Sequence, residues 1–175
     1  KGWIWGRSCW FTAAATTAAA AWRASSITGS DRSLAAVHGR GPLDVYAVGL
    51  DGVVLHFDGL VWETRDSGTT ASLNGVWCDA EGQTVAVGAG GLVLNNSGIL
   101  GEDTPWLAQD SGTAFSLYDV TGDGAGGAYA AGFNGIVLHY DGAAWEVITT
   151  GYHDRLNAIH VNSCGDILAG GLWGL

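Results

Sequence analysis

The sequence predicts an all-β protein that folds as a β-propeller, in which four-stranded blades are arranged around an axis. Three observations support this prediction. One pattern recurs four times at nearly constant spacing, each copy holds short apolar runs of strand length, and turn dipeptides separate those runs. Units of about 40–45 residues with four antiparallel strands are typical of propeller blades. We therefore expect four blades of four strands within a single domain, 1–175.

A leucine opens each copy of the repeat, and Val or Ile follows it three residues later. The copies begin 39, 44 and 39 residues apart, and a glycine precedes each leucine by five residues. In the last three copies a Trp precedes that glycine by a further six residues. Registers that repeat together are hard to obtain by chance, so we interpret the chain as a repeat protein. The copies begin at Leu34, Leu73, Leu117 and Leu156.

Each copy predicts four short antiparallel strands, named a to d in chain order, with strand a beginning at the leucine. Strand b is expected at 44–49, 83–88, 127–132 and 166–171, and each run leads into a Gly-x-x-Gly step. Inside this step, Asp51-Gly52, Gly90-Gly91 and Asn134-Gly135 tolerate the positive φ angles of a type I′ turn, which joins antiparallel strands. Strand c follows at 53–57, 92–95 and 136–140, and a second turn then leads into strand d, which carries the Trp.

The two ends of the chain predict how the ring closes. Blades 1 to 3 are expected at 34–72, 73–116 and 117–155. Residues 1–33 match strands c and d, and 156–175 match strands a and b, so one fourth blade is predicted to be shared between the N- and C-termini. Such sharing removes a free sheet edge. The alternative is a fragment of a six- to eight-bladed propeller.

Two of the three cysteines bear on this closure. Cys9 falls at the expected c–d turn of the shared blade and Cys164 at its a–b turn, which lie on the same side of one blade if the ring closes. A disulfide between them would join the two termini across a very long loop, where chain-entropy arguments predict a large stabilisation. The other interpretation is that both are small buried or turn residues.

Composition excludes several classes of protein. Seventeen acidic residues against seven basic ones give a net charge of −10, which argues against binding nucleic acid because phosphates require clustered Lys and Arg. The hydrophobic fraction of 47% excludes intrinsic disorder. No apolar run reaches the roughly 20 residues that a membrane-spanning helix needs.

The repeated residues resemble a known family. Gly-x-Val-Leu-His-x-Asp-Gly-x-x-Trp, found at 52–62 and 135–145, is followed by Asp-Ser-Gly-Thr at 66–69 and 110–113 and by the leucine pattern. Together they resemble the BNR or Asp-box-like propeller repeats of bacteria, which are grouped with YVTN and photosystem-II-assembly-factor-like repeats. The resemblance covers about 34–175. It implies a propeller fold and an extracellular or cell-envelope location in a bacterium.

The resemblance is less specific about activity. Relatives of such repeats include sialidases, which use an arginine cluster, a tyrosine nucleophile and acidic partners, and no position-by-position match to that set occurs. The Asp-box itself is usually structural, so Asp58 and Asp141 are not expected to be catalytic. The loop around Asp123 lacks the serial ligands of an EF-hand and is interpreted as a lengthened a–b hairpin. No catalytic motif is found, and no enzyme activity is expected.

One face of the ring is the predicted binding surface, because the b–c turns and d–a loops meet there and vary in chemistry on a constant frame. Trp173 occupies a turn position and either binds a sugar or a protein partner or packs within the shared blade. The candidate binding residues are Arg32, Asp51, Phe115, Asn134, Asp154, Arg155 and Trp173.

Four histidines occupy equivalent positions in pairs. His38 and His160 lie at the end of strand a, so they are candidate ligands for a metal ion in the channel, although strand-end hydrogen bonding is the favoured role. His56 and His139 each precede an aromatic residue and an Asp-Gly turn, and a hydrogen bond to that turn is expected of them.

These observations predict a non-enzymatic binding or scaffold module without a cofactor. Its partner is expected to be a protein or a surface glycan, recognised through the loop face. One alternative is that the chain is part of a larger sialidase- or glycosidase-like propeller enzyme. Another is a structural subunit of an envelope assembly.

Overall fold

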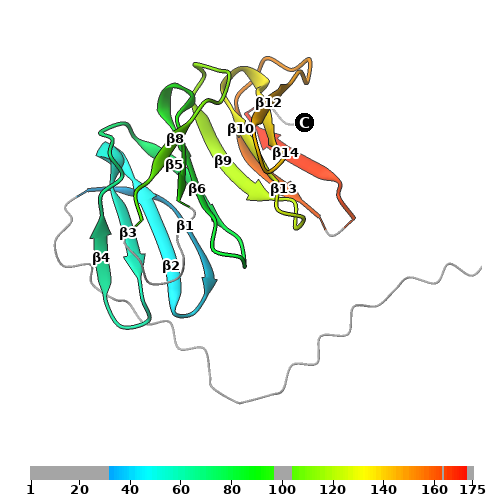
Figure 1. Ribbon diagram of the computed structural model, residues 1–175. Helices are drawn as coiled ribbons and strands as arrows, with labels where there is room; N and C mark the ends of the chain where they lie inside the picture. Colours follow the sequence, from blue (N-terminus) through cyan, green and yellow to red (C-terminus); the bar gives the residue numbers. More distant parts are fainter. Residues whose placement is uncertain (1–31, 97–103, 163, 173–175) are drawn as a thin grey trace, which may run out of the picture.

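The computed structural model describes residues 32–96, 104–162 and 164–172, and their architecture is all-β. Figure 1 shows the sheets side by side in chain order, from blue to red. Three 3-10 turns, η1 (Leu50–Gly52), η2 (Ala89–Gly91) and η3 (Phe133–Gly135), are the helical elements of this part of the chain, and none of them could cross a membrane. The strands are β1 (Leu34–Gly41), β2 (Asp44–Gly49), β3 (Val54–Phe57), β4 (Trp62–Arg65), β5 (Leu73–Cys78), β6 (Thr84–Gly88), β7 (Val93–Asn96), β8 (Leu107–Gln109), β9 (Leu117–Gly122), β10 (Ala128–Gly132), β11 (Val137–Tyr140), β12 (Trp145–Ile148), β13 (Leu156–Val161) and β14 (Ile167–Gly171).

The sheets follow the repeat. Three of them are four-stranded antiparallel meanders, β1–β4, β5–β8 and β9–β12, and the described part of the fourth is the pair β13–β14. Equivalent residues pair in the same register, so that Tyr46 lies opposite His56 and Tyr129 lies opposite His139. The antiparallel propeller blades predicted from the sequence are thereby confirmed. We refer to the four sheets as blades 1 to 4.

Apolar side chains fill the spaces between neighbouring blades. Val48 and Val54 of blade 1 pack with Leu73 and Leu94 of blade 2, and the same positions are used between the following blades. The strands that begin each blade pack against one another in turn, β1 on β5, β5 on β9 and β9 on β13. Both faces of blades 2 and 3 are covered, and most residues of strands b and c of these blades are buried.

Each b–c turn is held by the loop that precedes its blade. The first residue of every described b–c turn donates its backbone N–H to the carbonyl oxygen just before strand a, with N–O distances of 2.8–3.1 Å. These four hydrogen bonds run from Leu50 to Ser33, from Ala89 to Ser72, from Phe133 to Ser116 and from Leu172 to Arg155. The b–c and d–a connections therefore meet on one face of the molecule, which we call the loop face.

The loop that follows the blade contacts the same turn. In blade 1, the buried Ser67 hydroxyl donates to the Gly52 carbonyl at 2.6 Å, and in blade 3, Thr150 donates to Gly135 at 2.8 Å. In blade 2 the Thr113 carbonyl oxygen of the following loop lies against Gly91. The b–c turns of blades 1 to 3 are therefore each enclosed between two d–a loops. The Asp-Ser-Gly-Thr segment of the repeat consequently has a structural role.

Both glycines of the Gly-x-x-Gly step are required by this enclosure. A Cβ at Gly88 would come within 2.2 Å of the Ser72 carbonyl oxygen, and one at Gly91 within 2.0 Å of the Thr113 carbonyl oxygen. Gly91 has a φ of +75°, and its neighbour Gly90 has a φ of +67°. The positive φ angles at both central positions confirm the predicted type I′ geometry.

The described parts of the four blades form an open arc (Figure 1). In the described part of the chain, β13 of blade 4 has no packing against β1 of blade 1 comparable to that between successive blades. The N-terminal strands predicted to complete blade 4 lie outside the described residues. The blade shared between the termini therefore stays a prediction, as does its alternative, a fragment of a larger ring.

Substitutions at two adjacent glycines of η2 test whether the d–a loops enclose the b–c turn of blade 2. Gly90→Ala should cost about 1 kcal/mol in the free energy of unfolding, because its φ is positive but nothing lies near its Cβ position. Gly91→Ala should cost about 3 kcal/mol or more, because the new methyl group also collides with a carbonyl oxygen. Urea unfolding measures both values, and equal losses would show that the two d–a loops do not confine the turn.

Candidate binding face

The structure places Arg32 and Asp51 together on the loop face. An Arg32 guanidinium nitrogen, Nη1, donates to the main-chain carbonyl of Asp51 at 3.1 Å, and both residues are exposed. Asp51 has a φ of 54°, which an aspartate tolerates at the tip of a type I′ turn. This pair joins the loop before blade 1 to the b–c turn of blade 1.

Phe115 and Asn134, two other predicted binding residues, border a shared hollow of about 190 Å³. The hollow lies between the loop before blade 3, the turn η3, and the outer strand β12 with the loop that follows it. Its lining is mainly apolar and includes Ile136, Val147, Ile148 and Tyr152. Phe115, Val147, Ile148 and Tyr152 are each at least 38% exposed, so these side chains are accessible to a partner.

Phe133 extends the apolar surface beside this hollow. It is 50% exposed at the tip of η3, and its ring centroid lies 5.9 Å from that of Phe115. We call Phe115, Phe133, Val147, Ile148 and Tyr152 the apolar patch. Four of the five were not predicted as binding residues. Phe133 occupies a variable position of the Gly-x-x-Gly step, a signal that was available, whereas Val147 and Ile148 look like ordinary strand residues in the sequence.

Arg155 lies elsewhere on the molecule, next to a central cavity of about 460 Å³. Its guanidinium carbon lies 3.9 Å from the centroid of the Tyr118 ring. The residues that follow the first leucine of each repeat gather around this cavity, and they are Ala35, Asn74, Tyr118 and Asn157. Asp154 is exposed on the adjoining loop. The predicted binding residues are thus spread over three places rather than one.

Two predicted sites include a residue that lies outside the described part of the chain. Trp173 and Cys9 both lie outside them, so the binding role of Trp173 and the disulfide between Cys9 and Cys164 stay predictions. Cys164 itself is exposed in the a–b hairpin of blade 4, where its backbone N–H donates to Asn162 Oδ1 at 2.9 Å.

The candidate metal ligands His38 and His160 lie in different surroundings. His38 Nδ1 accepts a hydrogen bond of 3.1 Å from the backbone N–H of Cys78 in blade 2, and His160 is exposed. Burial, together with the charge of Arg40, lowers the pKa of His38, which favours the neutral ring that this hydrogen bond requires. Among the described residues, no three His, Cys, Asp or Glu side chains form a group that could hold a metal ion.

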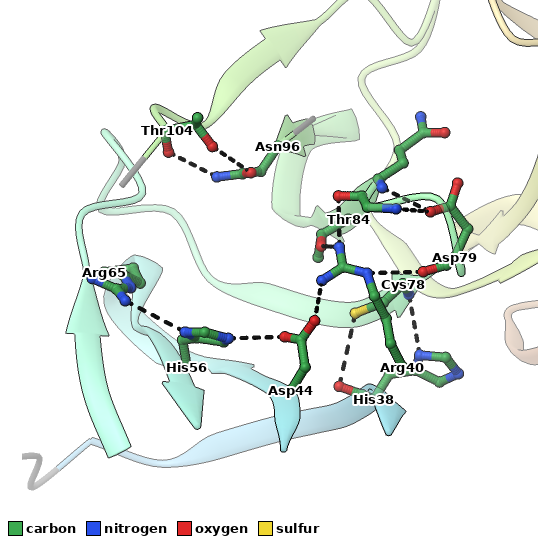
Figure 2. A network of polar contacts seen from close by, with 12 residues as sticks. His38, Arg40, Asp44, His56, Arg65, Cys78, Asp79, Thr84, Asn96 and Thr104 are labelled. Atoms are coloured by element: carbon green, nitrogen blue, oxygen red, sulfur yellow. Dashed lines mark hydrogen bonds and ion pairs between the residues drawn. The ribbon is translucent and has the colours of Figure 1, made fainter. Parts of the chain in front are cut away.

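An arginine joins blades 1 and 2 on the side of the a–b hairpins. Figure 2 shows Arg40, at the end of β1, reaching into the hairpin that connects β5 and β6. It donates to the carbonyl oxygens of Asp79 and Gly82 at 2.8 and 2.6 Å, and to Thr84 Oγ1 at 2.6 Å. With its side chain only 10% exposed, Arg40 needs a counter-charge, and Asp44 supplies it at 2.6 Å.

Asp44 is held from two sides. Its second carboxylate oxygen lies 2.8 Å from His56 Nε2, as Figure 2 shows. Burial alone would raise the pKa of Asp44, but the hydrogen bonds from Arg40 and His56 and their charges outweigh it and lower the pKa below its usual value. The ionised carboxylate is therefore the form that this network stabilises.

Blade 1 departs from the other blades at this position. In blades 2 to 4 the residue equivalent to Arg40 is Asp79, Asp123 or Asn162, and its side-chain oxygen accepts two backbone N–H groups of its own a–b hairpin. The interpretation of the Asp123 loop as a hairpin is supported by these contacts. Arg40 instead contacts the hairpin of the next blade.

The expected role of His56 and His139 needs correction. Neither is shown bonding to the Asp-Gly turn that follows it. Each stacks on the tyrosine opposite it on strand b, Tyr46 or Tyr129, with ring centroids 4.5 Å apart. The physical reason is the register, which places these planar rings directly opposite each other on one face of the blade.

The turn aspartates bond to their own turns. Asp58 Oδ1 accepts from the backbone N–H groups of Leu60 and Val61, and Asp141 Oδ1 accepts from those of Ala143 and Ala144, all at 2.8–2.9 Å. These hydrogen bonds lower the pKa of both exposed carboxyl groups. The geometry agrees with the structural role that the sequence predicted for them.

The network around Asp44 predicts an acid-dependent loss of stability. Asp44→Asn should lower the free energy of unfolding by about 2 kcal/mol at pH 7, because it removes a charged acceptor from Arg40. Since the folded-state pKa is lowered, this contribution is fully present above the ordinary carboxyl pKa and disappears as the pH falls through the folded-state pKa. The difference between the variant and the unmodified chain should therefore shrink below about pH 4.

Urea unfolding at a series of pH values measures this difference. Asp51→Asn is the matched control, because Asp51 is exposed and the contact described for it uses its backbone carbonyl. It should leave stability unchanged at every pH. A difference for Asp44→Asn that is absent at pH 7, or that persists undiminished in acid, would contradict the described network.

Comparisons with known proteins agree with the fold. No family model matches the chain. A segment of 59 residues is 37% identical to "Immune protein Tsi7" of Pseudomonas aeruginosa. The matched segment covers 34% of this chain and 19% of that protein. The solved structure "YCF48 bound to D1 peptide" superposes with a TM-score of 0.63 and 15% identity, over 81% of this chain and 47% of that chain. This chain spans about half of that structure and a fifth of the curated relative. The structural likeness shows that the fold is that of a β-propeller, whereas the Asp-box assignment itself still rests on the sequence.

Proposed function

We propose that this chain is a non-enzymatic binding module that recognises an extended segment of a protein through the loop face. The observation on which the proposal rests is the apolar patch, with its hollow on blade 3 between the loops that precede and follow this blade. Exposed aromatic side chains are enriched among the residues that dominate the energy of protein interfaces. A cluster of them beside a concave, preformed surface is typical of a binding site.

The size of the hollow favours a peptide side chain over a whole small molecule. Pockets that enclose a small ligand measure about 300–1,000 Å³, and this hollow measures about 190 Å³. It suits one large apolar side chain, while Phe133 and Phe115 would contact the neighbouring residues of the same segment. The solved structure similar to this chain also has a peptide bound, which supports the proposal by analogy.

The lining also favours a protein over a glycan. A sugar requires many hydrogen-bonding groups besides an aromatic face. The polar side chains around the hollow are those of Asn134, Thr149, Thr150, Tyr152 and His153, but its surface is mainly apolar and the Thr150 hydroxyl already donates to the Gly135 carbonyl. Neither the hollow nor the central cavity has a carboxylate among its described lining residues, whereas glycoside hydrolysis uses two. Both features support binding without hydrolysis.

A displayed library of random peptides, selected against the immobilised chain, tests the proposal. We expect the selected peptides to carry a large apolar or aromatic residue. Phe115→Ser should weaken their binding about 10-fold or more, because the truncation of a central aromatic side chain at an interface typically costs about 2 kcal/mol. Fluorescence polarisation with one labelled peptide measures the loss.

Leu60→Ser is the control variant. Leu60 is 86% exposed, but it lies in the c–d turn of blade 1, on the side of the molecule opposite the loop face. Peptide binding should be unchanged by this substitution. No enrichment of peptides, or binding confined to a glycan array, would contradict the proposed function.

A further inference from the structure

The outer strand of blade 3 is an exposed sheet edge with little protection. Proteins usually protect such edges by a charged side chain, a proline, a bulge or a very short strand. In blade 1 the outer strand β4 ends in Arg65, and in blade 2 the outer strand β8 has only three residues. β12 instead ends in Val147 and Ile148, which are 48% and 38% exposed, and its pairing with β11 has no bulge. Among blades 1 to 3, blade 3 therefore has the edge most open to pairing with another strand.

The backbone of β12 has groups available for such pairing. Hydrogen-bonded and non-hydrogen-bonded residue pairs alternate along an antiparallel ladder. At the hairpin between β11 and β12, the Asp141 N–H donates to the Ala144 carbonyl at 3.3 Å, so every second residue after Ala144 bonds to β11. The N–H and C=O groups of Trp145 and Val147 then point away from β11, toward the free edge. In the part of the chain that the structure describes, no other strand pairs with β12.

The side chains of β12 give this edge two different faces. Val147 lies beside the loop that precedes blade 3, since a Cβ at Gly112 would be 3.6 Å from its Cγ2 atom. The same loop carries Phe115, which lines the hollow together with Val147. Glu146 projects to the opposite face, because successive residues of a strand alternate. The side chains of an added strand would alternate in the same way, between the apolar patch and Glu146.

The charge of this region indicates the charge of the partner. Residues 104–154, which include all of blade 3, contain six acidic residues and no lysine or arginine. Glu146 lies on β12 itself, Asp141 lies in the turn before it, and both are exposed. A second copy of the chain would bring the same negative charge to the edge. Electrostatic complementarity therefore favours a basic segment over a second copy.

We propose that the segment bound at the apolar patch is a basic, extended peptide that adds to β12 as a fifth strand of blade 3. Its backbone forms hydrogen bonds with the outward N–H and C=O groups of Val147. Its side chains alternate, with apolar residues toward Phe115 and the hollow and basic residues toward Glu146. The inference rests on the proposed function, to which it adds the conformation and the charge of the partner.

Val147→Pro tests the strand pairing, with the labelled library peptide that binds best as the probe. Proline removes the N–H that points to the edge but no hydrogen bond to β11, so the blade should stay folded, as circular dichroism will show. Fluorescence polarisation should show a loss of affinity of about 10-fold or more, because a backbone hydrogen bond is lost and the proline ring obstructs the added strand. Thr64→Pro, at the equivalent position of β4 in blade 1, is the control and should leave the affinity unchanged.

Modified peptides give a second measurement that does not depend on the folding of a variant. Methylation of every second backbone nitrogen of the peptide should abolish binding in one register and spare it in the other, because only alternate residues of an added strand bond to its neighbour. The selected peptides should carry Lys or Arg at alternate positions. Glu146→Lys should weaken their binding about 5-fold, whereas Glu63→Lys, its equivalent in blade 1, should not.

The outcomes separate this inference from the proposed function. Binding that requires Phe115 but tolerates Val147→Pro and both methylation registers would overturn the added strand and leave the proposed function standing. Selected peptides without basic residues would overturn the assigned partner. So would a dimer of the chain that Val147→Pro dissociates, because a second copy would then occupy the edge. Binding that Phe115→Ser leaves unchanged would contradict the proposed function, and this inference with it.

Discussion

The rest of the structure depends on the enclosure of each b–c turn between two d–a loops. The turn donates one backbone N–H to the loop before its blade, and in blades 1 and 3 it accepts a side-chain hydroxyl from the loop after it. A loop that contacts the turns on both sides fixes the separation of successive blades. The apolar faces of the blades can then interdigitate, and the burial of Leu73, Leu117 and Leu156 follows from this spacing.

The same enclosure positions the candidate site. Because the turns are held at one end of every blade, their tips and the adjacent loops form a continuous face. The side chains on that face are free to vary, and in blades 2 and 3 they include Phe115 and Phe133. Arg40 and Asp44 secure the opposite side between blades 1 and 2. A rigid frame with variable loops is the general arrangement of a binding module.

The fold could be predicted from the sequence because the constraints behind it are local. The Gly-x-x-Gly step requires glycine at both ends, because any side chain at Gly88 or Gly91 would collide with a carbonyl oxygen. The leucine pattern marks the strand that neighbouring blades cover. Turn positions, strand order and packing faces could therefore all be derived from short patterns.

The site was less predictable, since it depends on which exposed residues of different blades come together. Phe115 and Asn134 were predicted and share a hollow, but Val147 joins them only through the pairing of β12 with β11, and Tyr152 through the contact of its loop with Gly135. Arg40 was missed because it occupies a position where the other blades cap their own hairpins with Asp or Asn. His56 and His139 were assigned to the turns, whereas the strand register pairs them with tyrosines.

Hydrogen exchange of the amides that join turns to loops tests this account most directly. The N–H groups of Ala89 and Phe133 lie at the start of b–c turns, where an unconstrained amide would exchange within seconds. If the loops enclose these turns, both amides should exchange as slowly as those of the buried strands, at a rate set by global unfolding. Exchange as fast as that of Gly124, at the exposed tip of the a–b hairpin of blade 3, would contradict the account.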